Sequence, residues 1–206
     1  MRLYHHPFSF NARRAVMTAL HLQAPVELVL IDLASQEHLK PEFLALNPNH
    51  KVPVLEDGDF HLWESCAIMQ YLAEKTPSQS LYPTQIRSRA DVNRWLFWSA
   101  QHLTPAVGIL GWEHAVKGIL GLGAADPAEV ERGERQFAEL ASILDSHLAG
   151  RVYVCGPELT LADLALAAPL GHAGPARLTL APYAHLNRWL HQVQDLDAWK
   201  KTALPA

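Results

Sequence analysis

The amino-acid sequence predicts two folded parts, an α/β domain over the first third of the chain and an all-helical domain after it. Segments with the patterns of strands and helices alternate up to about residue 75. The next stretch, residues 76–85, is rich in Ser, Thr and Pro, which is the composition of an exposed linker. Beyond it apolar residues recur at helical spacing, and we find no convincing strand period.

The α/β part begins with a strand, a helix and a second strand. Leu3 and Tyr4 form a short apolar start, and a helical pattern runs from about residue 11 to residue 22. The mainly apolar run at 26–31 is interpreted as a buried strand. Two strands joined through a helix form a βαβ unit.

A polar stretch, a hairpin and a helix complete this part. After the polar residues 35–47, two apolar runs at 52–55 and 60–63 flank Glu-Asp-Gly-Asp. Because Asp-Gly is a strong hairpin-turn signal, these runs are expected to be antiparallel strands. Ser65 is expected to cap a helix that ends before Pro77. The predicted order is β-α-β-α-β-β-α.

The second half shows two sets of residues at helical spacing, and each set marks one buried stripe. The sets are Val92, Trp95, Leu96, Ser99 and Leu103, and then Val130, Phe137, Leu140, Ala141, Leu144 and Leu148. Shorter helices are expected near 161–172, 183–193 and 196–203. The first of them starts at 160–163, which has the pattern of a capping box with apolar flanks placed for a hydrophobic staple.

The composition indicates a folded protein with a small-molecule partner. Of the 206 residues, 49% are hydrophobic and 18% are charged, which is enough for a substantial core. The formal net charge is −4 and like charges form no long run, so we expect no nucleic-acid partner and no polybasic membrane contact. No apolar run follows the start and none is long enough to cross a membrane, so we expect neither secretion nor a membrane span.

Cysteine and histidine usage predicts neither a disulfide framework nor a metal site. Cys66 and Cys155 each lie outside any CxxC or CxxxC spacing. The 12 histidines include no HExxH or HxxxH pair on a helix. This cysteine usage fits a reducing cytoplasm, and we expect no metal.

Four segments in order carry a resemblance to a known family. They are residues 3–14, 47–55, 63–68 and 160–163. Together they resemble the cytosolic glutathione transferases, closest to serine-type, phi-like and bacterial members, over nearly the whole chain. The resemblance implies a thioredoxin-like glutathione-binding domain at 1–76, a linker at 77–86 and an all-helical domain at 87–206 that contributes the electrophile site. It also implies a cytoplasmic, homodimeric enzyme of detoxification.

The resemblance implies that Ser9 holds the sulfur of glutathione as a thiolate. A thiol with a pKa near 8.5 is only a few per cent ionised at pH 7, so the site must favour the anion. Ser9 directly precedes the helix expected from about Asn11, where a hydroxyl donor and the positive end of the helix act together. Taken alone, Ser9 reads as a helix cap. Tyr4 is the alternative donor. Arg13 and Arg14 are either cations that help to polarise the site or orient glutathione, or exposed helical arginines, and the exposed arginine is the commoner case.

The remaining glutathione contacts are also implied by the resemblance. A cis Pro53 turns the Val52 backbone toward the cysteinyl unit, which pairs like an added strand. Glu64 takes the ammonium, and Ser65 takes the γ-glutamyl carboxylate at a helix N-terminus. The two cations placed for the glycine carboxylate are His38 and Lys51.

The residues that contact the electrophile are less clearly indicated by the sequence than those that bind glutathione. Candidates for its pocket are Phe8, Phe10, Trp98 and His102. Aromatic residues at helical spacing are more often core than pocket lining, so Trp95, Trp98 and Trp112 are interpreted as structural. The natural co-substrate therefore cannot be named from the sequence.

The expected reaction is conjugation of the glutathione thiolate to small hydrophobic electrophiles, with glutathione peroxidase activity as a side reaction. Thiol–disulfide oxidoreductases of the family place cysteine at the position of Ser9. Isomerase members show Ser-Ser-Cys where this chain has Pro7-Phe8-Ser9. Isomerase or dehalogenase activity, disulfide exchange and a non-catalytic binding module remain the alternatives.

Overall fold

The computed structural model describes residues 1–204, which divide into two compact units. The first unit is Met1–Tyr82 together with the segment from Leu196, and the second is Pro83–Asp195. The resemblance implied a helical domain at 87–206. The segment from Leu196 instead belongs with the first unit, because α10 (Asp197–Lys200) packs on α1 (Phe10–His21). Residues 205 and 206 of the expected helical domain lie outside the described part.

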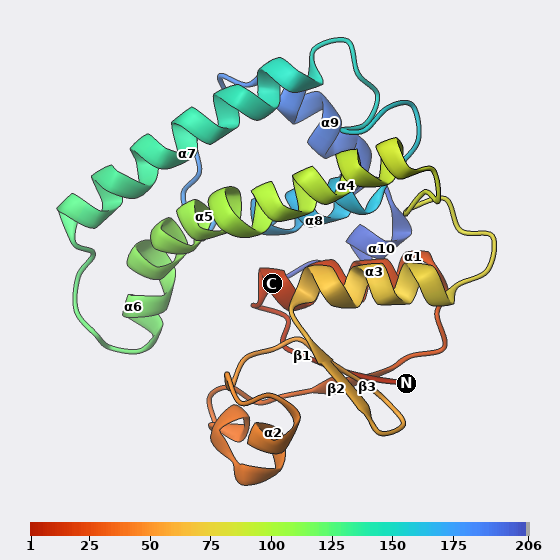
Figure 1. The fold of residues 1–206 in the computed structure, drawn as a ribbon. Coiled ribbons are helices and arrows are strands. Elements are labelled where there is room, and N and C mark those ends of the chain that lie inside the picture. The colour runs from red at the N-terminus through yellow and green to blue at the C-terminus, as the bar shows by residue number, and fades with distance from the viewer. Residues whose placement is uncertain (205–206) are drawn as a thin grey trace. The chain divides into compact units, whose positions relative to one another are not determined.

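The first unit contains a four-stranded mixed sheet in the order β2-β1-β3-β4 (Figure 1). The strands are β1 (Arg2–His5), β2 (Glu27–Leu30), β3 (Val54–Asp57) and β4 (Phe60–Trp63). Strand β1 runs parallel to β2 and antiparallel to β3, and β3 and β4 form the expected hairpin. Its turn contains Gly58 at φ 66°, a conformation that glycine adopts without steric cost.

The strand predicted at 26–31 is present, but the prediction that it is buried is wrong. Strand β2 covers only Glu27–Leu30 and lies at the edge of the sheet. Leu28 is 40% exposed and Leu30 is 58% exposed. An edge strand has a neighbouring strand on one side only, so an apolar run there is less covered than the same run in a central strand.

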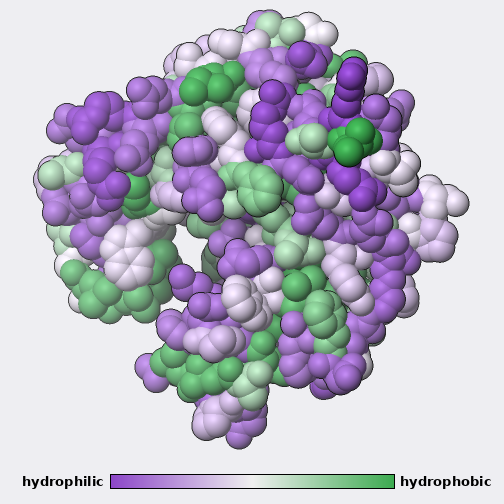
Figure 2. All heavy atoms as spheres, in the orientation of Figure 1, coloured by the Kyte–Doolittle hydropathy of each residue, from purple (hydrophilic) through white to green (hydrophobic). Residues whose placement is uncertain are grey.

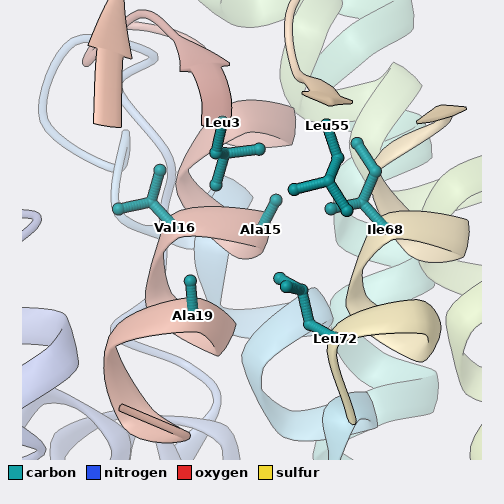
Figure 3. Packing of buried hydrophobic residues seen from close by; sticks show 7 residues of the cluster. All are labelled: Leu3, Ala15, Val16, Ala19, Leu55, Ile68 and Leu72. Carbon is teal, nitrogen blue, oxygen red and sulfur yellow. The ribbon is translucent and has the colours of Figure 1, made fainter. Parts of the chain in front are cut away.

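Helices cover the sheet on both faces, so that neighbouring residues of one strand enter different cores. On one face α1 and α3 (Ser65–Lys75) pack on Leu3 and Leu55 (Figure 3). The residues labelled there are Leu3, Ala15, Val16, Ala19, Leu55, Ile68 and Leu72. On the other face Tyr4 and Val54 pack with Phe43 of α2 (Pro41–Leu46), which follows the 3-10 turn η1 (Glu37–Leu39).

The expected exposed linker is partly buried. Leu81 is 1% and Tyr82 is 6% exposed, and the Gln70 side chain of α3 donates a hydrogen bond to the Tyr82 hydroxyl at 3.0 Å. The Ser, Thr and Pro content of this stretch therefore conceals two buried residues. The linker boundaries expected at 77–86 stay a prediction.

The second unit is helical, as predicted. A nearly continuous helical run comprises α4 (Ile86–Trp98), η2 (Ser99–Leu103), α5 (Thr104–Gly111), η3 (Trp112–Val116) and α6 (Lys117–Ile119), with π-helical turns at η2 and η3. It is followed by α7 (Pro127–Leu148), α8 (Leu161–Leu170) and α9 (Ala184–Gln194). The predicted stripe of α4 is buried, whereas in α7 Val130 and Leu140 are only partly buried. Figure 2 shows hydrophobic residues gathered over α6 and the loop after it, where Ile119 is 78% exposed.

The capping box at the start of α8 is confirmed. The fully buried Asp163 carboxylate accepts hydrogen bonds from the Thr160 N–H at 2.9 Å, the Val154 N–H at 2.9 Å and the Trp189 indole N–H at 2.8 Å. Asp163 thus ties the start of α8 to the preceding loop and to α9. Burial raises the pKa of this carboxyl group, and the hydrogen bonds act in the opposite direction.

Candidate functional site

Ser9 lies between β1 and α1 and is the N-cap residue of α1. Its backbone is extended, with φ −92° and ψ 108°, and its side-chain oxygen accepts a hydrogen bond from the Ala12 N–H at 3.1 Å. The side chain is only partly buried. Within residues 1–204 no acceptor takes the hydrogen of the hydroxyl group. Ser9 can therefore cap the helix with its oxygen and still donate to a ligand.

Tyr4, the alternative donor, is engaged elsewhere. Its hydroxyl donates to Glu56 Oε2 at 2.6 Å, and the side chain is 9% exposed. Strand pairing explains this contact, because Tyr4 and Glu56 lie on the adjacent strands β1 and β3. Burial and the Glu56 carboxylate raise the pKa of Tyr4. A buried phenol that already donates to a carboxylate is poorly suited to hold a sulfur anion.

The Val52–Pro53 peptide bond is cis, as the resemblance implied. The ladder between β1 and β3 reaches only from Val54 to Glu56, so the Val52 backbone lies beyond it. The preceding loop is held from inside by Asn47, which is 3% exposed and donates its side-chain amide to the Lys51 carbonyl at 2.7 Å. Asn47 lies in the segment 47–55 that carries the resemblance but had no role assigned to it. Its Oδ1 accepts from the Asn49 N–H at 3.0 Å in an Asx turn, a local signal that can reveal such a role.

Ser65 was expected to be the cap of α3, and this prediction is wrong by one residue. The N-cap position belongs to Glu64, whose carbonyl accepts the first helical hydrogen bond from Ile68 N–H at 3.0 Å. Glu64 has φ 73°, a left-handed conformation that is uncommon for residues other than glycine. Its carboxylate makes no capping hydrogen bond. Strained positions of this kind cluster at ligand-binding sites.

Ser65 is the first residue of α3 and is 7% exposed. In the described part of the chain no hydrogen bond occupies its hydroxyl group. The N–H groups of the first helical turn have no partner within the helix. Ser65 therefore offers a hydroxyl and a free helix end to an anion.

His38 and the loop that carries Lys51 lie close together. The His38 ring in η1 is 6.5 Å from the ring of His50, and Lys51 is exposed. His38 Nδ1 is buried without a hydrogen-bond partner among the described residues. An unpaired buried polar atom is costly unless a ligand satisfies it.

The four electrophile candidates fall into two pairs. Phe8, 56% exposed, and the half-buried Phe10 belong to the first unit. Trp98 and His102 belong to the second, with ring centroids 6.2 Å apart. Of the tryptophans expected to be structural, Trp95 is buried, Trp98 is half-buried, and Trp112 is 42% exposed, so Trp112 is not a core residue.

Arg13 and Arg14 are not exposed helical arginines. Arg13 is 4% exposed and Arg14 is fully buried. The reason is tertiary, because α1 is covered by α3 and by α10. Arg14 donates to the Cys66 sulfur at 3.5 Å, and burial lowers the pKa of Arg13 to about 10.

Within residues 1–204, no group of three or more His, Cys, Asp and Glu side chains is placed to hold a metal ion. No helix in this part of the chain is both long enough and apolar enough to cross a membrane.

Comparisons with known proteins agree with the fold. The family model of the glutathione S-transferase N-terminal domain matches residues 1–74, and that of the C-terminal domain matches residues 127–192. Glutathione S-transferase 3 of Zea mays is 36% identical over 207 residues, which cover 98% of this chain and 92% of the relative.

Solved structures are similar along the whole chain. Glutathione transferase F7 from Populus trichocarpa has a TM-score of 0.90 at 26% identity, covering 98% of this chain and 97% of that chain. Maize glutathione S-transferase I in complex with an atrazine–glutathione conjugate has a TM-score of 0.88 at 28% identity, covering 98% and 95%. The maize and poplar relatives support the phi-like side of the resemblance. With both family models and a full-length relative matched, the chain belongs to the glutathione S-transferase family.

Proposed function

We propose that this glutathione transferase is of the serine type: it ionises glutathione with the Ser9 hydroxyl and transfers the thiolate to a small electrophile. The observation that carries the proposal is the double use of the hydroxyl. Its oxygen accepts from Ala12 N–H at 3.1 Å, and its hydrogen remains available at the N-terminus of a 12-residue helix. Lowering the pKa of the thiol by about two corresponds to roughly 2.7 kcal/mol of preference for the anion. A hydroxyl donor and a helix end together are sufficient for that.

The backbone of Val52 positions the cysteinyl unit of glutathione. Val52 is 9% exposed and lies past the end of the β1–β3 ladder. An extended peptide can therefore pair with its N–H and C=O like an added strand. The Asn47 side chain holds this loop through the Lys51 carbonyl, which fixes the distance between the added strand and the sulfur position.

Charged groups hold the two ends of the tripeptide. The start of α3 supplies the Ser65 hydroxyl and N–H to the γ-glutamyl carboxylate, and the Glu64 carboxylate pairs with the ammonium. Two observations support this role of Glu64: its backbone has a positive φ, and its carboxylate is not used to cap the helix. At the other end, His38 and Lys51 pair with the glycine carboxylate, which gives the buried His38 Nδ1 a partner.

In the reaction a carbon–sulfur bond forms, and the leaving group departs with the electrons of the bond that breaks. The protein contributes position and charge stabilisation rather than a covalent intermediate. Phe8, Phe10, Trp98 and His102 stay the candidates for contacts with the electrophile. The solved maize relative holds an atrazine–glutathione conjugate, and another related structure holds lactoylglutathione, so we extend small hydrophobic electrophiles to this chain as substrates.

The proposal includes the setting of the enzyme. It acts in detoxification in the cytoplasm, as a homodimer and without a metal. Light scattering or analytical ultracentrifugation tests the assembly, since a dimer has twice the chain mass of 22.9 kDa. A monomer at micromolar concentration contradicts the proposed dimer, but it does not bear on the chemistry proposed for Ser9.

The test of the activity is retention on immobilised glutathione followed by turnover of a generic aryl halide. An organic hydroperoxide and a mixed disulfide run in parallel. We expect retention, conjugation, a weaker peroxidase activity and little disulfide exchange, because Ser9 cannot form a mixed disulfide. Disulfide exchange that exceeds conjugation overturns the serine-type assignment. Retention without any turnover favours a binding module, and absence of retention overturns the proposed site.

A further inference from the structure

The Arg13 side chain is a buried cation that none of the proposed glutathione contacts uses. Its Nε donates to Thr202 Oγ1 at 3.3 Å, and its Nη2 donates to the Trp199 carbonyl at 3.5 Å. The guanidinium carbon lies 3.9 Å from the centroid of the Trp199 ring. All of these partners are neutral and belong to the segment that starts at Leu196. Among the described residues no carboxylate compensates the Arg13 charge.

Arg13 stands one helical turn after Ser9. The Arg13 N–H donates to the Ser9 carbonyl at 2.8 Å, so the two residues are related as i and i+4. Side chains at this spacing share a face of the helix, with Cβ atoms about 6 Å apart. Helical side chains also lean toward the N-terminus. The Arg13 side chain therefore belongs to the helical turn that starts at Ser9.

The hydrogen bonds and the ring contact of Arg13 supply no anion to compensate its charge. Arg13 is 4% exposed and Trp199 is 9% exposed. Burying a cation without an anion is unfavourable, and apolar side chains of similar volume pack in such places at no such cost. Burial also weakens solvent screening, so the field of a buried charge reaches further than that of an exposed one.

We propose that Arg13 is a supporting cation for the chemistry at Ser9: it stabilises the bound glutathione thiolate through space, and Trp199 and Thr202 keep it shielded from water. The inference rests on the proposed function. It assigns a role to the segment from Leu196, which the resemblance had placed in the helical domain. That segment completes the electrostatic environment of the first turn of α1.

Other ionisable groups near the start of α1 define the background for a pH measurement. They are Arg14 on α1, His5 on β1, His6 after it, Cys66 on α3, and Asp197 and Lys200 on α10. Burial lowers the pKa values of His5 and His6, so both are mainly neutral above pH 7. Asp197 and Lys200 are exposed and opposite in sign. Cys66 is the protein thiol near the site, and burial raises the pKa of the other cysteine, Cys155, to about 12. In a Cys66→Ser background, thiolate absorbance below pH 10 therefore reports glutathione.

The test compares Arg13→Met and Arg13→Lys with the parent chain in the Cys66→Ser background. The pKa of bound glutathione is read from the ultraviolet absorbance of the thiolate between pH 5 and 10, and kcat for an aryl halide is measured over the same range. We expect Arg13→Met to raise the pKa of the bound thiol by about 0.5 to 1. Its kcat should be about three- to tenfold lower at pH 6.5 and should approach the parent value above pH 9. Arg13→Lys, which keeps the charge, should stay within about 0.3 of the parent pKa.

Two further variants separate charge from packing. Thr202→Val removes one hydrogen bond and leaves the cation in place, so it should change melting temperature more than the pKa of the bound thiol. Trp199→Leu admits water to the guanidinium and should raise the pKa of the bound thiol by less than Arg13→Met does. This variant also tests the inference if Arg13→Met does not fold. An unchanged pKa in whichever of Arg13→Met and Trp199→Leu folds overturns the inference, as does a kcat loss that is equal at every pH. A parent chain that fails to lower the pKa of glutathione overturns the proposed function instead.

Discussion

Replacing Ser9 with alanine removes two interactions whose effects can be measured separately. The first is the cap bond to Ala12 N–H at 3.1 Å. Loss of a serine cap costs about 1 kcal/mol, which lowers the melting temperature by about 2–4 °C in a chain of this size. The second is the donor to the sulfur. If the hydroxyl supplies about half of a two-unit decrease, its loss raises the pKa of the bound thiol by about 1.

This increase in the pKa of the bound thiol determines how the loss of turnover depends on pH. Below both pKa values the variant holds about tenfold less thiolate than the parent, which corresponds to a barrier change of about 1.4 kcal/mol. As pH rises through the two values the difference shrinks, and above both it disappears. The assay is kcat for an aryl halide at saturating glutathione from pH 6 to 10, with glutathione affinity measured by calorimetry. Affinity should change by no more than several-fold, because the tripeptide keeps its other contacts.

A matched variant separates the cap from the donor. Ser9→Asp keeps a side-chain oxygen for the Ala12 N–H and so should retain thermal stability. It removes the donor and adds a negative charge beside the sulfur, so its turnover should be at or below that of Ser9→Ala. Unchanged turnover of Ser9→Ala at pH 6.5 refutes the assignment. A turnover loss in Ser9→Ala that Ser9→Asp restores shows that capping alone matters, and refutes it as well.

Four other side chains can be tested separately from Ser9. Tyr4→Phe removes the hydroxyl that donates to Glu56 at 2.6 Å and should lower the free energy of unfolding, measured in urea, by about 1 kcal/mol. The rate of conjugation should be unchanged. A tenfold loss of kcat would show that Tyr4, and not Ser9, contacts the sulfur. Ser65→Ala should weaken glutathione binding at least about fivefold with little change in kcat, because its contact is equal in the ground and transition states; a defect in kcat alone contradicts this role. Asp163→Asn places an amide N–H₂ against a cluster of donors and should cost about 3 kcal/mol or more in urea unfolding, whereas a loss below 1 kcal/mol shows that the buried carboxylate is dispensable. Burial raises the pKa of Cys155 to about 12. Iodoacetamide at pH 8 should therefore alkylate this thiol at least about 100-fold more slowly in the native chain than in urea, as followed by mass spectrometry. Equal alkylation rates in the two conditions would show that the fold does not protect Cys155.

The elements that the sequence predicted well are those with local signals. The Asp57-Gly58 pair sets the β3–β4 hairpin, and Pro77 lies just beyond the end of α3. The capping box at 160–163 starts α8 where it was expected. In each case the physical cause lies within a few residues, either a backbone conformation that few residues adopt or a side chain that bonds to a nearby N–H.

The errors concern properties that depend on neighbours far along the chain. Strand β2 has the residue pattern of a buried strand, but its edge position leaves Leu30 58% exposed. Arg13 is covered by a segment nearly 190 residues later, through Trp199 and Thr202. The partner of Tyr4 follows from the register of β1 against β3. Periodicity shows which residues can face a core, but it does not show which element covers them.

For the site, the sequence supplied the resemblance that implies the identity and order of the proposed residues, and their types suit glutathione's thiol, carboxylates and ammonium. Only the tertiary structure decided which groups are available. It left the Ser9 hydrogen unused and joined Tyr4 to Glu56, and it placed Glu64 in the left-handed region at the start of α3. The physical reason is that hydrogen-bond occupancy and burial are properties of packed elements, whereas residue type and helix-cap signals belong to short stretches of sequence.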